Sequence, residues 1–319
     1  MRLDNKELVR KADLALAELT TDGGAMLPVQ SKKFMQKAIA ESKLFQLATW
    51  RAMASQKEYI DQVTFGSRIM QRGTAGEALA LALRSKPDLD RVELDTKLIR
   101  GEVRIDQEVL EDNIEKEGFT NTLRDLLAKR WKRDLEYLLV RGDTALAGTG
   151  APGSDADYLS TLDGILKQAV THVTNAADAY ISKGPLRDAL FALPEQWKET
   201  TEDLAYLTAT DVEVRWRDII GDRIGLLADE VLQKKRTVAY GSIPVMAIGT
   251  FPQNVGTGSH CANIILTNPK NIHVGVCRNI KIKMGEDIGA DKVIIVISSR
   301  VDVKYLIEDA VVRVNNVKV

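Results

Sequence analysis

The sequence predicts an α+β fold, and three observations support this prediction. Apolar residues recur every three or four positions from Phe119 to Arg141, which is typical of one long amphipathic helix. Residues 58–65 and 91–105 alternate between apolar and polar side chains, as strands do. Residues 279–316 are dense in β-branched residues, which indicates strands that are paired and covered. With 319 residues, the chain is long enough for two or three core-bearing units.

The first 50 residues are expected to form an arm with little core of its own. Residues 1–19 are amphipathic and predict a helix, and residues 31–42 predict a second one. Between them, glycines and Pro28 favour turns. Residues 44–53 favour extended structure. We expect a segment that changes structure so often to lie against something else.

Residues 51–105 predict strands separated by a long excursion. The segment from Gly66 to Asp90 is too long for a tight hairpin turn. Within it, Leu79, Leu81 and Leu83 alternate with alanine. One interpretation is a short core helix. The other is a loop that docks on another subunit, since exposed apolar patches usually mark contacts.

The long predicted helix carries a basic cluster. Its members are Lys129, Arg130, Lys132 and Arg133. Asp134 and Glu136 each lie four residues after one of these bases, so one interpretation is a solvated face with ion pairs along the helix. The other is an electropositive face directed toward a polyanion.

The remaining elements follow in order. A short helix is expected from Asp106 to Asn113, and a further helix at 159–175, with His172 near its end. From residue 178 the pattern becomes α/β, with helices at 184–199 and 210–223 and a strand at 204–212. More strands are expected in a last group, at 236–252, 262–268, 271–276, 279–284, 293–307 and 310–316.

Composition excludes several classes of protein. There are 44 basic and 45 acidic side chains, so the net charge of −1 does not indicate general nucleic-acid binding. Two cysteines in so long a chain suit a reducing compartment. The charged N-terminus does not resemble a signal peptide, and no apolar run approaches a membrane span. We expect a soluble protein made in the cytoplasm.

The sequence contains no motif typical of catalysis or cofactor binding. The glycine-rich stretch at 142–159 lacks the Lys-Ser/Thr of a phosphate-binding loop. Histidine, the commonest general base, occurs only at His172, His260 and His273. Cys261 and Cys277 are too far apart for a close zinc-binding pair. We therefore expect no enzyme activity, no cofactor and no metal.

Five stretches in order carry a resemblance to a known family. They are "TTDGGAMLPVQ" at 20–30, the strands at 58–65 and 91–113, the helix at 119–141, "AYGSIPVMAIGTFP" at 239–252, and 262–287 followed by "AVVRVNN" at 310–316. Together they resemble the major capsid proteins of tailed bacteriophages, which share the HK-ninety-seven fold. Each stretch alone is loose, and their order along nearly the whole chain makes the resemblance specific.

The resemblance implies an HK-ninety-seven-type division of the chain. An N-terminal arm would occupy 1–50, and an E-loop hairpin with its flanking strands 51–105. A peripheral domain with the spine helix would occupy 106–177, and an axial α/β domain 178–290. Residues 291–319 would return as strands to the peripheral and axial sheets. The E-loop would contact a neighbouring subunit through Leu79, Leu81, Leu83 and Arg84. The inward face of the spine helix would carry the basic cluster defined above.

The resemblance also implies a function and partners. The chain would assemble as hexamers and pentamers into an icosahedral shell around double-stranded DNA, in a virion assembled in the host cytoplasm. Expected partners are a scaffolding protein, a portal protein, weakly contacted DNA and a decoration protein, with no membrane. Two alternatives stay open: an encapsulin-type shell that houses cargo enzymes, and a soluble α/β enzyme using 178–300.

Two features differ from some members of the resembled family. The Gly-Gly motif lies about 20 residues after Met1, so we expect a separate scaffolding protein rather than a fused one. Some relatives form a Lys–Asn isopeptide bond between subunits, and here Lys86 or Lys97 with Asn315 or Asn316 have the residue types for it. We do not expect this cross-link, and boiling shells in SDS would reveal it.

Overall fold

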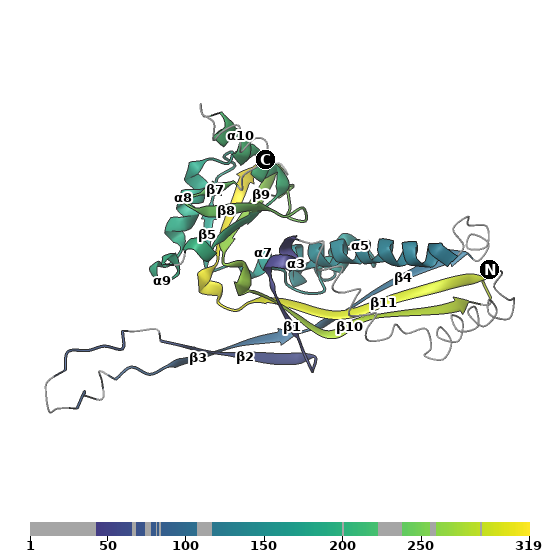
Figure 1. Ribbon diagram of the computed structural model, residues 1–319, viewed down its shortest axis with the longest axis horizontal. Helices are drawn as coiled ribbons and strands as arrows, with labels where there is room; N and C mark the ends of the chain where they lie inside the picture. Colours follow the sequence, from purple (N-terminus) through teal and green to yellow (C-terminus); the bar gives the residue numbers. More distant parts are fainter. Residues whose placement is uncertain are drawn as a thin grey trace, which may run out of the picture.

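The computed structural model describes residues 43–65, 68–73, 78–80, 82, 84–106, 117–199, 201–222, 238–255, 260–287 and 289–319. The helices expected at 1–19 and 31–42 lie outside these ranges, as do Leu81, Leu83 and residues 107–113 of the helix expected after Asp106. The described part combines helices with two larger sheets and a separate hairpin (Figure 1), which confirms the predicted α+β class.

The first sheet is a long, narrow plate of four strands in the order β1-β10-β11-β4. The strands are β1 (Thr49–Ala52), β10 (Ile272–Asp287), β11 (Lys292–Tyr305) and β4 (Lys97–Asp106). The sequence predicted separate strands at 271–276 and 279–284, but both belong to β10. The two predicted segments of β10 are separated by register shifts in its pairing with β11, at residues 276–281.

The second sheet has six strands in the order β5-β12-β9-β6-β8-β7. They are β5 (His172–Asn175), β12 (Val312–Lys318), β9 (Cys261–Thr267), β6 (Ala205–Thr208), β8 (Ile243–Ala247) and β7 (Ala239–Tyr240). Helices α8 (Lys183–Ala192), α9 (Glu195–Lys198) and α10 (Thr210–Gly221) lie around this sheet (Figure 1). The buried Tyr206 hydroxyl donates to the Leu186 carbonyl at 2.8 Å and so joins β6 to α8.

Short helical turns connect these elements. The 3₁₀ turns are η2 (Thr144–Leu146), η3 (Thr201–Asp203), η4 (Pro269–Asn271) and η5 (Glu308–Ala310). Before β1 lies α3 (Lys43–Leu47), where the sequence predicted extended structure throughout. The prediction is wrong there because Leu44 and Phe45 are both buried in the core, which one helical turn allows and an alternating strand does not.

The predicted long helix is α5 (Glu117–Arg141), and Figure 1 shows it lying along the four-stranded sheet. Its C-terminal half is firmly packed, with Leu135, Leu138 and Leu139 buried. The predicted apolar stripe is wrong at Leu126, whose side chain is 58% exposed. Among the described side chains of the helix, the stripe marks the buried face in the C-terminal half, where the helix meets α6 (Asp155–Leu159) and α7 (Ile165–Gln168).

The helix predicted at 159–175 is wrong, because two glycines bring the chain too close to α5 for a helix to pass. Gly164 donates its N–H to the Gly142 carbonyl at 2.8 Å. A Cβ atom on Gly142 would lie 2.3 Å from the Leu162 carbonyl oxygen, and one on Gly164 would lie 2.7 Å from the Val140 oxygen. The segment is therefore divided into α6, α7 and β5, with His172 at the start of a strand.

Two connections pass side by side between the sheets, and the Asn271 side chain clamps them together. Its amide nitrogen donates to the Ile307 carbonyl at 2.7 Å, and its amide oxygen accepts from the Ile307 N–H at 2.8 Å. The Leu306 N–H also donates to the Asn271 carbonyl at 2.9 Å. The path from β9 into β10 and the path from β11 toward β12 are thus bonded at one point.

Arg141, in the last turn of α5, joins the helix to the second sheet. Its Nε donates to the Thr250 carbonyl at 2.8 Å and its Nη2 to the Phe251 carbonyl at 3.0 Å. The guanidinium carbon also lies 4.7 Å from the Tyr137 ring centroid. A charged donor on two carbonyls is stronger than a neutral hydrogen bond.

We expect Arg141→Met to lower the free energy of unfolding by about 1.5–3 kcal/mol, because the variant keeps the apolar stem but loses both charged hydrogen bonds. Urea denaturation followed by circular dichroism would measure the loss. The exposed Arg133 on the same helix provides the control, since Arg133→Met should change stability by about 0.5 kcal/mol or less. Equal losses in the two variants would contradict the joining role of Arg141.

Candidate functional site

A two-stranded hairpin projects from the body of the molecule and forms a sheet of its own (Figure 1). Its strands are β2 (Lys57–Thr64) and β3 (Asp88–Asp95), paired antiparallel along their whole length. The sequence predicted one strand at 91–105, but that segment is divided at Thr96. The first part pairs with β2 and the second, β4, pairs with β11. The division is therefore caused by a change of partner.

One face of the hairpin presents an exposed apolar pair. Val63 is 62% exposed and Leu89 is 76% exposed, and the two are direct partners in the β2–β3 register. Side chains of directly paired residues point to the same face of a sheet. Four residue pairs closer to the body, Tyr59 lies on that same face and is also exposed. We refer to Tyr59, Val63 and Leu89 as the hairpin apolar face.

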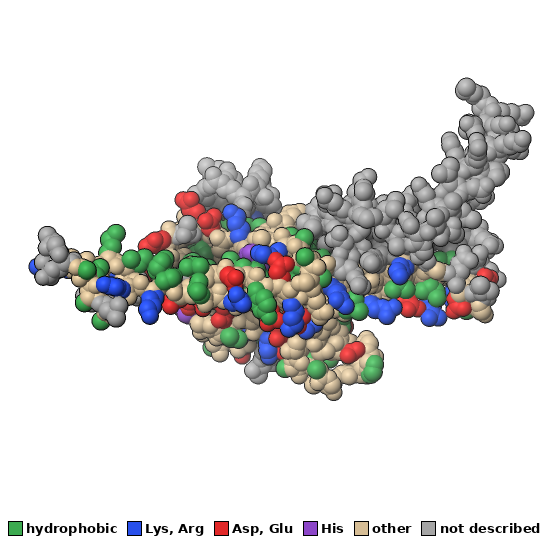
Figure 2. Space-filling view, turned by 90° about the horizontal axis from the view of Figure 1, so that it is seen from below, with side chains coloured by type: hydrophobic (Ala, Val, Ile, Leu, Met, Phe, Trp, Pro, Cys, Tyr) green, Lys and Arg blue, Asp and Glu red, His purple; other side chains and the backbone are tan. Residues whose placement is uncertain are grey.

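Two charged pairs link the strands of the hairpin to each other. Arg91 and Asp61 pair across the strands at 2.6 Å, between the apolar residues, and the Arg91 guanidinium lies 5.1 Å from the Tyr59 ring centroid. Lys57 pairs with Glu93 at 2.7 Å. Hydrophobic side chains accordingly stand out along the projecting part at the left of Figure 2, among interspersed basic and acidic groups. The surface is suited to burial against another protein.

The predicted loop contacts lie beyond this hairpin. Leu79 is 39% exposed, and the Nε of Arg84 donates to the Leu79 carbonyl at 3.1 Å. Leu81 and Leu83 lie outside the described residues. Sequence reasoning missed Val63 and Leu89. The period-two spacing of Tyr59, Val63 and Phe65 was the available signal, but the strand alone does not say whether that face is covered.

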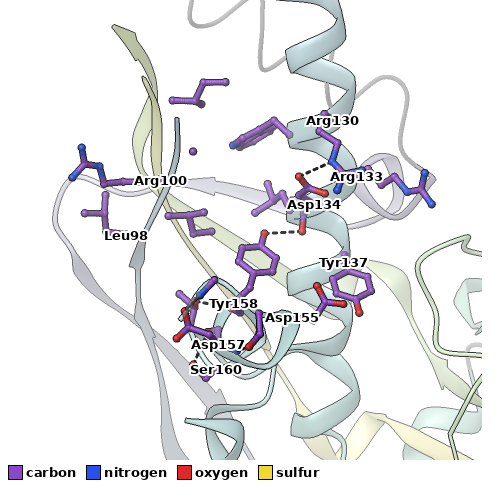
Figure 3. Close-up of a pocket in the computed structure, with 18 residues that line it drawn as sticks. Leu98, Arg100, Arg130, Arg133, Asp134, Tyr137, Asp155, Asp157, Tyr158 and Ser160 are labelled. Carbon is purple, nitrogen blue, oxygen red and sulfur yellow. Dashed lines mark hydrogen bonds and ion pairs between the residues drawn. The ribbon is translucent and has the colours of Figure 1, made fainter. Parts of the chain in front are cut away.

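The basic cluster lies beside a cavity of about 860 Å³ between α5, β4 and the segment that contains α6 (Figure 3). The Tyr158 hydroxyl donates to the Asp134 carbonyl at 2.8 Å, and this fixes the segment against α5. Burial raises the pKa of Tyr158 well above its ordinary value. The phenol therefore stays protonated and keeps this hydrogen bond at every physiological pH.

The four basic residues are not equivalent. Arg130 pairs with Asp134 at 3.0 Å, which confirms the predicted ion pair, and both side chains are largely exposed. Such a pair contributes little to stability. Arg130 and Arg133 are among the residues that line the cavity (Figure 3). Lys129 is exposed and Lys132 is partly buried. The cluster is thus a solvent-facing surface of α5.

Residues with possible catalytic or metal chemistry do not converge in the described ranges. Cys261 is buried, and its thiol donates to Asp178 Oδ1 at 3.2 Å. Burial raises the pKa of this thiol, which disfavours the reactive thiolate. His172 Nε2 lies 2.8 Å from Asp309 Oδ1. Across those ranges, no group of three or more His, Cys, Asp or Glu could hold a metal ion.

None of the helices in the described part of the chain combines the length and apolarity needed to span a bilayer.

The arrangement of plate, projecting hairpin and second sheet is that of phage capsid proteins. A chain in the procapsid of satellite phage P4 matches with a TM-score of 0.67 and 15% identity, over 100% of this chain and 98% of that one. A capsid chain of the native GTA particle matches with a TM-score of 0.61 and 14% identity, over 86% of this chain and 89% of that one. The SrpI encapsulin of Synechococcus elongatus PCC 7942 matches with a TM-score of 0.52 and 13% identity, over 88% of this chain and 89% of that one. The fold is therefore the HK-ninety-seven type expected from the sequence.

A relative in sequence shows the family. The prophage capsid protein YqbE of Bacillus subtilis (strain 168) is 34% identical over 318 residues, which cover 98% of this chain and 99% of that protein. No family model matches the chain. The chain belongs to the family of this prophage capsid protein.

Proposed function

We propose that the chain is the major capsid subunit of a tailed bacteriophage or prophage, with no enzymatic activity. It assembles as hexamers and pentamers into an icosahedral shell around double-stranded DNA, in a virion assembled in the host cytoplasm. The observation that carries this proposal is the projecting hairpin, whose apolar face has no cover from the described part of its own chain. An exposed apolar surface on a protruding element is typical of a subunit interface.

The two sheets correspond to the two domains of such a subunit. The four-stranded sheet with α5 is the peripheral domain, and α5 is its spine helix. The six-stranded sheet with α8, α9 and α10 is the axial domain, near the centre of each hexamer or pentamer. The hairpin is the E-loop, and residues 1–50 form the arm.

The hairpin apolar face, with Leu79, Leu81, Leu83 and Arg84 beyond it, docks on a neighbouring copy. Each fully buried Val or Leu side chain contributes about 1.5–3 kcal/mol relative to an exposed one. Repeated around a closed shell, several such contacts per subunit hold the assembly together, and closed symmetry prevents open filaments.

The basic cluster on α5 faces the interior, where it contacts a separate scaffolding protein before packaging and DNA afterwards. The ion pair between Arg130 and Asp134 supports a weak contact, because part of the positive charge is already neutralised. A portal protein and a decoration protein complete the expected partners.

Replacing Lys129, Arg130 and Arg133 with glutamine is expected to leave shells intact and to weaken binding of a double-stranded DNA oligonucleotide. Phosphate contacts release counterions, so the slope of log K against log salt should fall by at most about 2.7 for three cations. Fluorescence anisotropy over a series of salt concentrations measures the slope.

The control variant replaces three exposed basic residues on the side of the six-stranded sheet with glutamine. These residues are Lys183, Arg187 and Lys270. This glutamine variant should bind DNA as the wild type does. An equal loss of binding in both variants would assign the effect to net charge, and no loss in the α5 variant would remove DNA from the role of the cluster.

Electron microscopy of the expressed protein, alone and with its scaffold, tests the function. We expect closed shells of uniform size. A uniformly monomeric species under both conditions would exclude both cage functions. The likeness to the SrpI encapsulin keeps a cargo-housing shell as the second candidate. Nucleic acid inside purified particles supports the phage function, and a co-purified cargo enzyme supports the encapsulin function.

A further inference from the structure

The two faces of the projecting hairpin differ in what covers them. The hairpin apolar face is exposed, but the residues at alternate positions point the other way. There Glu58, Ile60, Gln62 and Val92 are half-buried and Leu94 is fully buried. We refer to these five residues as the hairpin inner face. This face lies against the hairpin's own chain.

The root of the inner face is fixed to the four-stranded sheet. Glu58 pairs with Arg51 of β1 at 2.6 Å. On β11, the buried Asp302 accepts from the Asp95 N–H through Oδ2 and from the Val303 N–H through Oδ1, both at 2.8 Å. A carboxylate between two backbone donors makes strong, directional hydrogen bonds. The plate therefore sets the direction in which the hairpin leaves it.

Further along β2, the inner face makes a second contact, with the connection between the two sheets. The Gln62 amide nitrogen donates to the Leu306 carbonyl. Leu306 directly follows β11 on the path to β12. Figure 1 shows the hairpin extending past the end of the plate where this path leaves for the six-stranded sheet. The hairpin is therefore bonded to the plate at its root and to the connection at Gln62.

Every backbone polar group of Leu306 and Ile307 is hydrogen-bonded. Asn271 bonds three of them: the Leu306 N–H donates to the Asn271 carbonyl, and the Ile307 N–H and carbonyl bond the Asn271 side-chain amide. The fourth, the Leu306 carbonyl, accepts from Gln62. Because a partly buried carbonyl that loses its donor is unfavourable, displacement of the connection draws the hairpin with it.

We propose that Gln62 couples the direction of the hairpin to the angle between the two sheets. A change in that angle moves Leu306, and Leu306 moves the middle of the hairpin through Gln62 while the plate holds the root. The reverse also holds, because a coupling free energy between two sites is reciprocal. Val63 of the hairpin apolar face adjoins Gln62 and points to the opposite side of the same strand. A copy that docks on that face therefore acts on the angle, and this last step alone rests on the proposed function.

Two other features limit the change in angle. Arg141 joins α5 to the second sheet, and both sheets contribute to one hydrophobic core. Loss of the Gln62 hydrogen bond should therefore widen the range of angles without separating the sheets.

Substitutions that differ in the donor test the coupling in the full-length chain, kept below the concentration at which it assembles. Gln62→Met keeps the length of the side chain and removes the donor, whereas Gln62→Lys keeps a donor. The Leu306 and Ile307 amide hydrogens bond Asn271 and not Gln62, and their exchange should accelerate by about 2- to 10-fold in Gln62→Met. In Gln62→Lys their exchange should stay at the wild-type rate.

Spin labels measure the angle itself. Lys129→Cys on α5 and Lys183→Cys on α8 place them at exposed positions outside the hairpin, in a chain whose partly exposed Cys277 is replaced by serine. Double electron–electron resonance should give a broader distance distribution in Gln62→Met than in the wild type. The wild-type width should return in Gln62→Lys. It should also persist in the matched control Gln71→Met, whose side chain is exposed beyond the hairpin.

The outcomes are distinct. A wild-type width in Gln62→Met would overturn the coupling even if the amides exchange faster, because Gln62 would then only anchor the hairpin. Equal broadening in Gln62→Lys would also overturn it, since the hydrogen bond would not be the cause. Gln62→Ala is the second variant without a donor and decides in the same way if Gln62→Met does not fold. A coupled chain that never forms shells would reject the proposed function alone, and shells from an uncoupled chain would reject the coupling alone.

Discussion

Replacing Val63 and Leu89 with serine is expected to abolish closed shells while leaving the subunit folded. Both side chains are exposed, so the stability of the isolated subunit should change by about 0.5 kcal/mol or less. At an intersubunit contact, the loss of two buried apolar side chains would cost about 3–6 kcal/mol. That is a factor of about 10²–10⁴ in each contact equilibrium, repeated over every subunit.

Negative-stain electron microscopy and sedimentation velocity measure assembly, and thermal unfolding checks the fold. The matched control is Asp61→Ser with Arg91→Ser, which removes the adjacent ion-paired rung of the same face and leaves the net charge unchanged. This control variant should still form closed shells. Wild-type shells from the Val63/Leu89 variant would show that this face is not an interface.

A second set of substitutions tests the predicted loop contacts. Serine at 79, 81 and 83 should likewise give soluble, folded subunits that fail to make stable shells. Loss of folding would instead show that these leucines belong to the core.

Gly142→Ala is expected to prevent folding or to lower the free energy of unfolding by about 3 kcal/mol or more. The added Cβ would meet two backbone oxygens, Leu162 O at 2.3 Å and Leu138 O at 2.8 Å, and backbone atoms cannot rotate away as side chains do. The end of α5 and the segment before α7 would have to separate, which opens the buried contact between them.

Soluble yield and urea denaturation measure this loss. Gly285→Ala is the matched control, because Gly285 lies in β10, is exposed and has open space around its Cβ position. The control should change stability by about 1 kcal/mol or less. Equal urea midpoints for Gly142→Ala and the wild type would mean that the contact between Gly142 and the segment before α7 has room for a side chain.

Elements with strong local patterns were predictable from the sequence. The long helix, the alternating strand β2 and most of the C-terminal strands follow directly from periodicity. The errors lie where tertiary structure decides. Gly164 precedes α7 and prevents one continuous helix through its contact with Gly142, a residue outside its own segment. Thr96 divides a continuous strand pattern because β3 and β4 pair with different neighbours.

The candidate site was only partly predictable for the same reason. Leucines at 79, 81 and 83 attracted attention because they alternate within a loop. Val63 and Leu89 lie in a good strand pattern, and only the structure shows that nothing in the described part of the chain covers their face. Asp302 was not predictable in the same way, because Arg300 and Lys304 are also charged in its strand, and its two backbone donors come from the fold.

The Asn271 clamp bears on how a subunit can change shape. The chain leaves the six-stranded sheet before β10 and approaches it again after β11, and both passages are bonded to one another through the amide side chain and the carbonyl of Asn271. Because the two passages run in opposite directions and are bonded to one another, a change in tilt between the plate and the six-stranded sheet has to move both passages together. Any difference in tilt between copies in differently curved parts of a shell would therefore have to pass through this crossing and through the single core that the two sheets share.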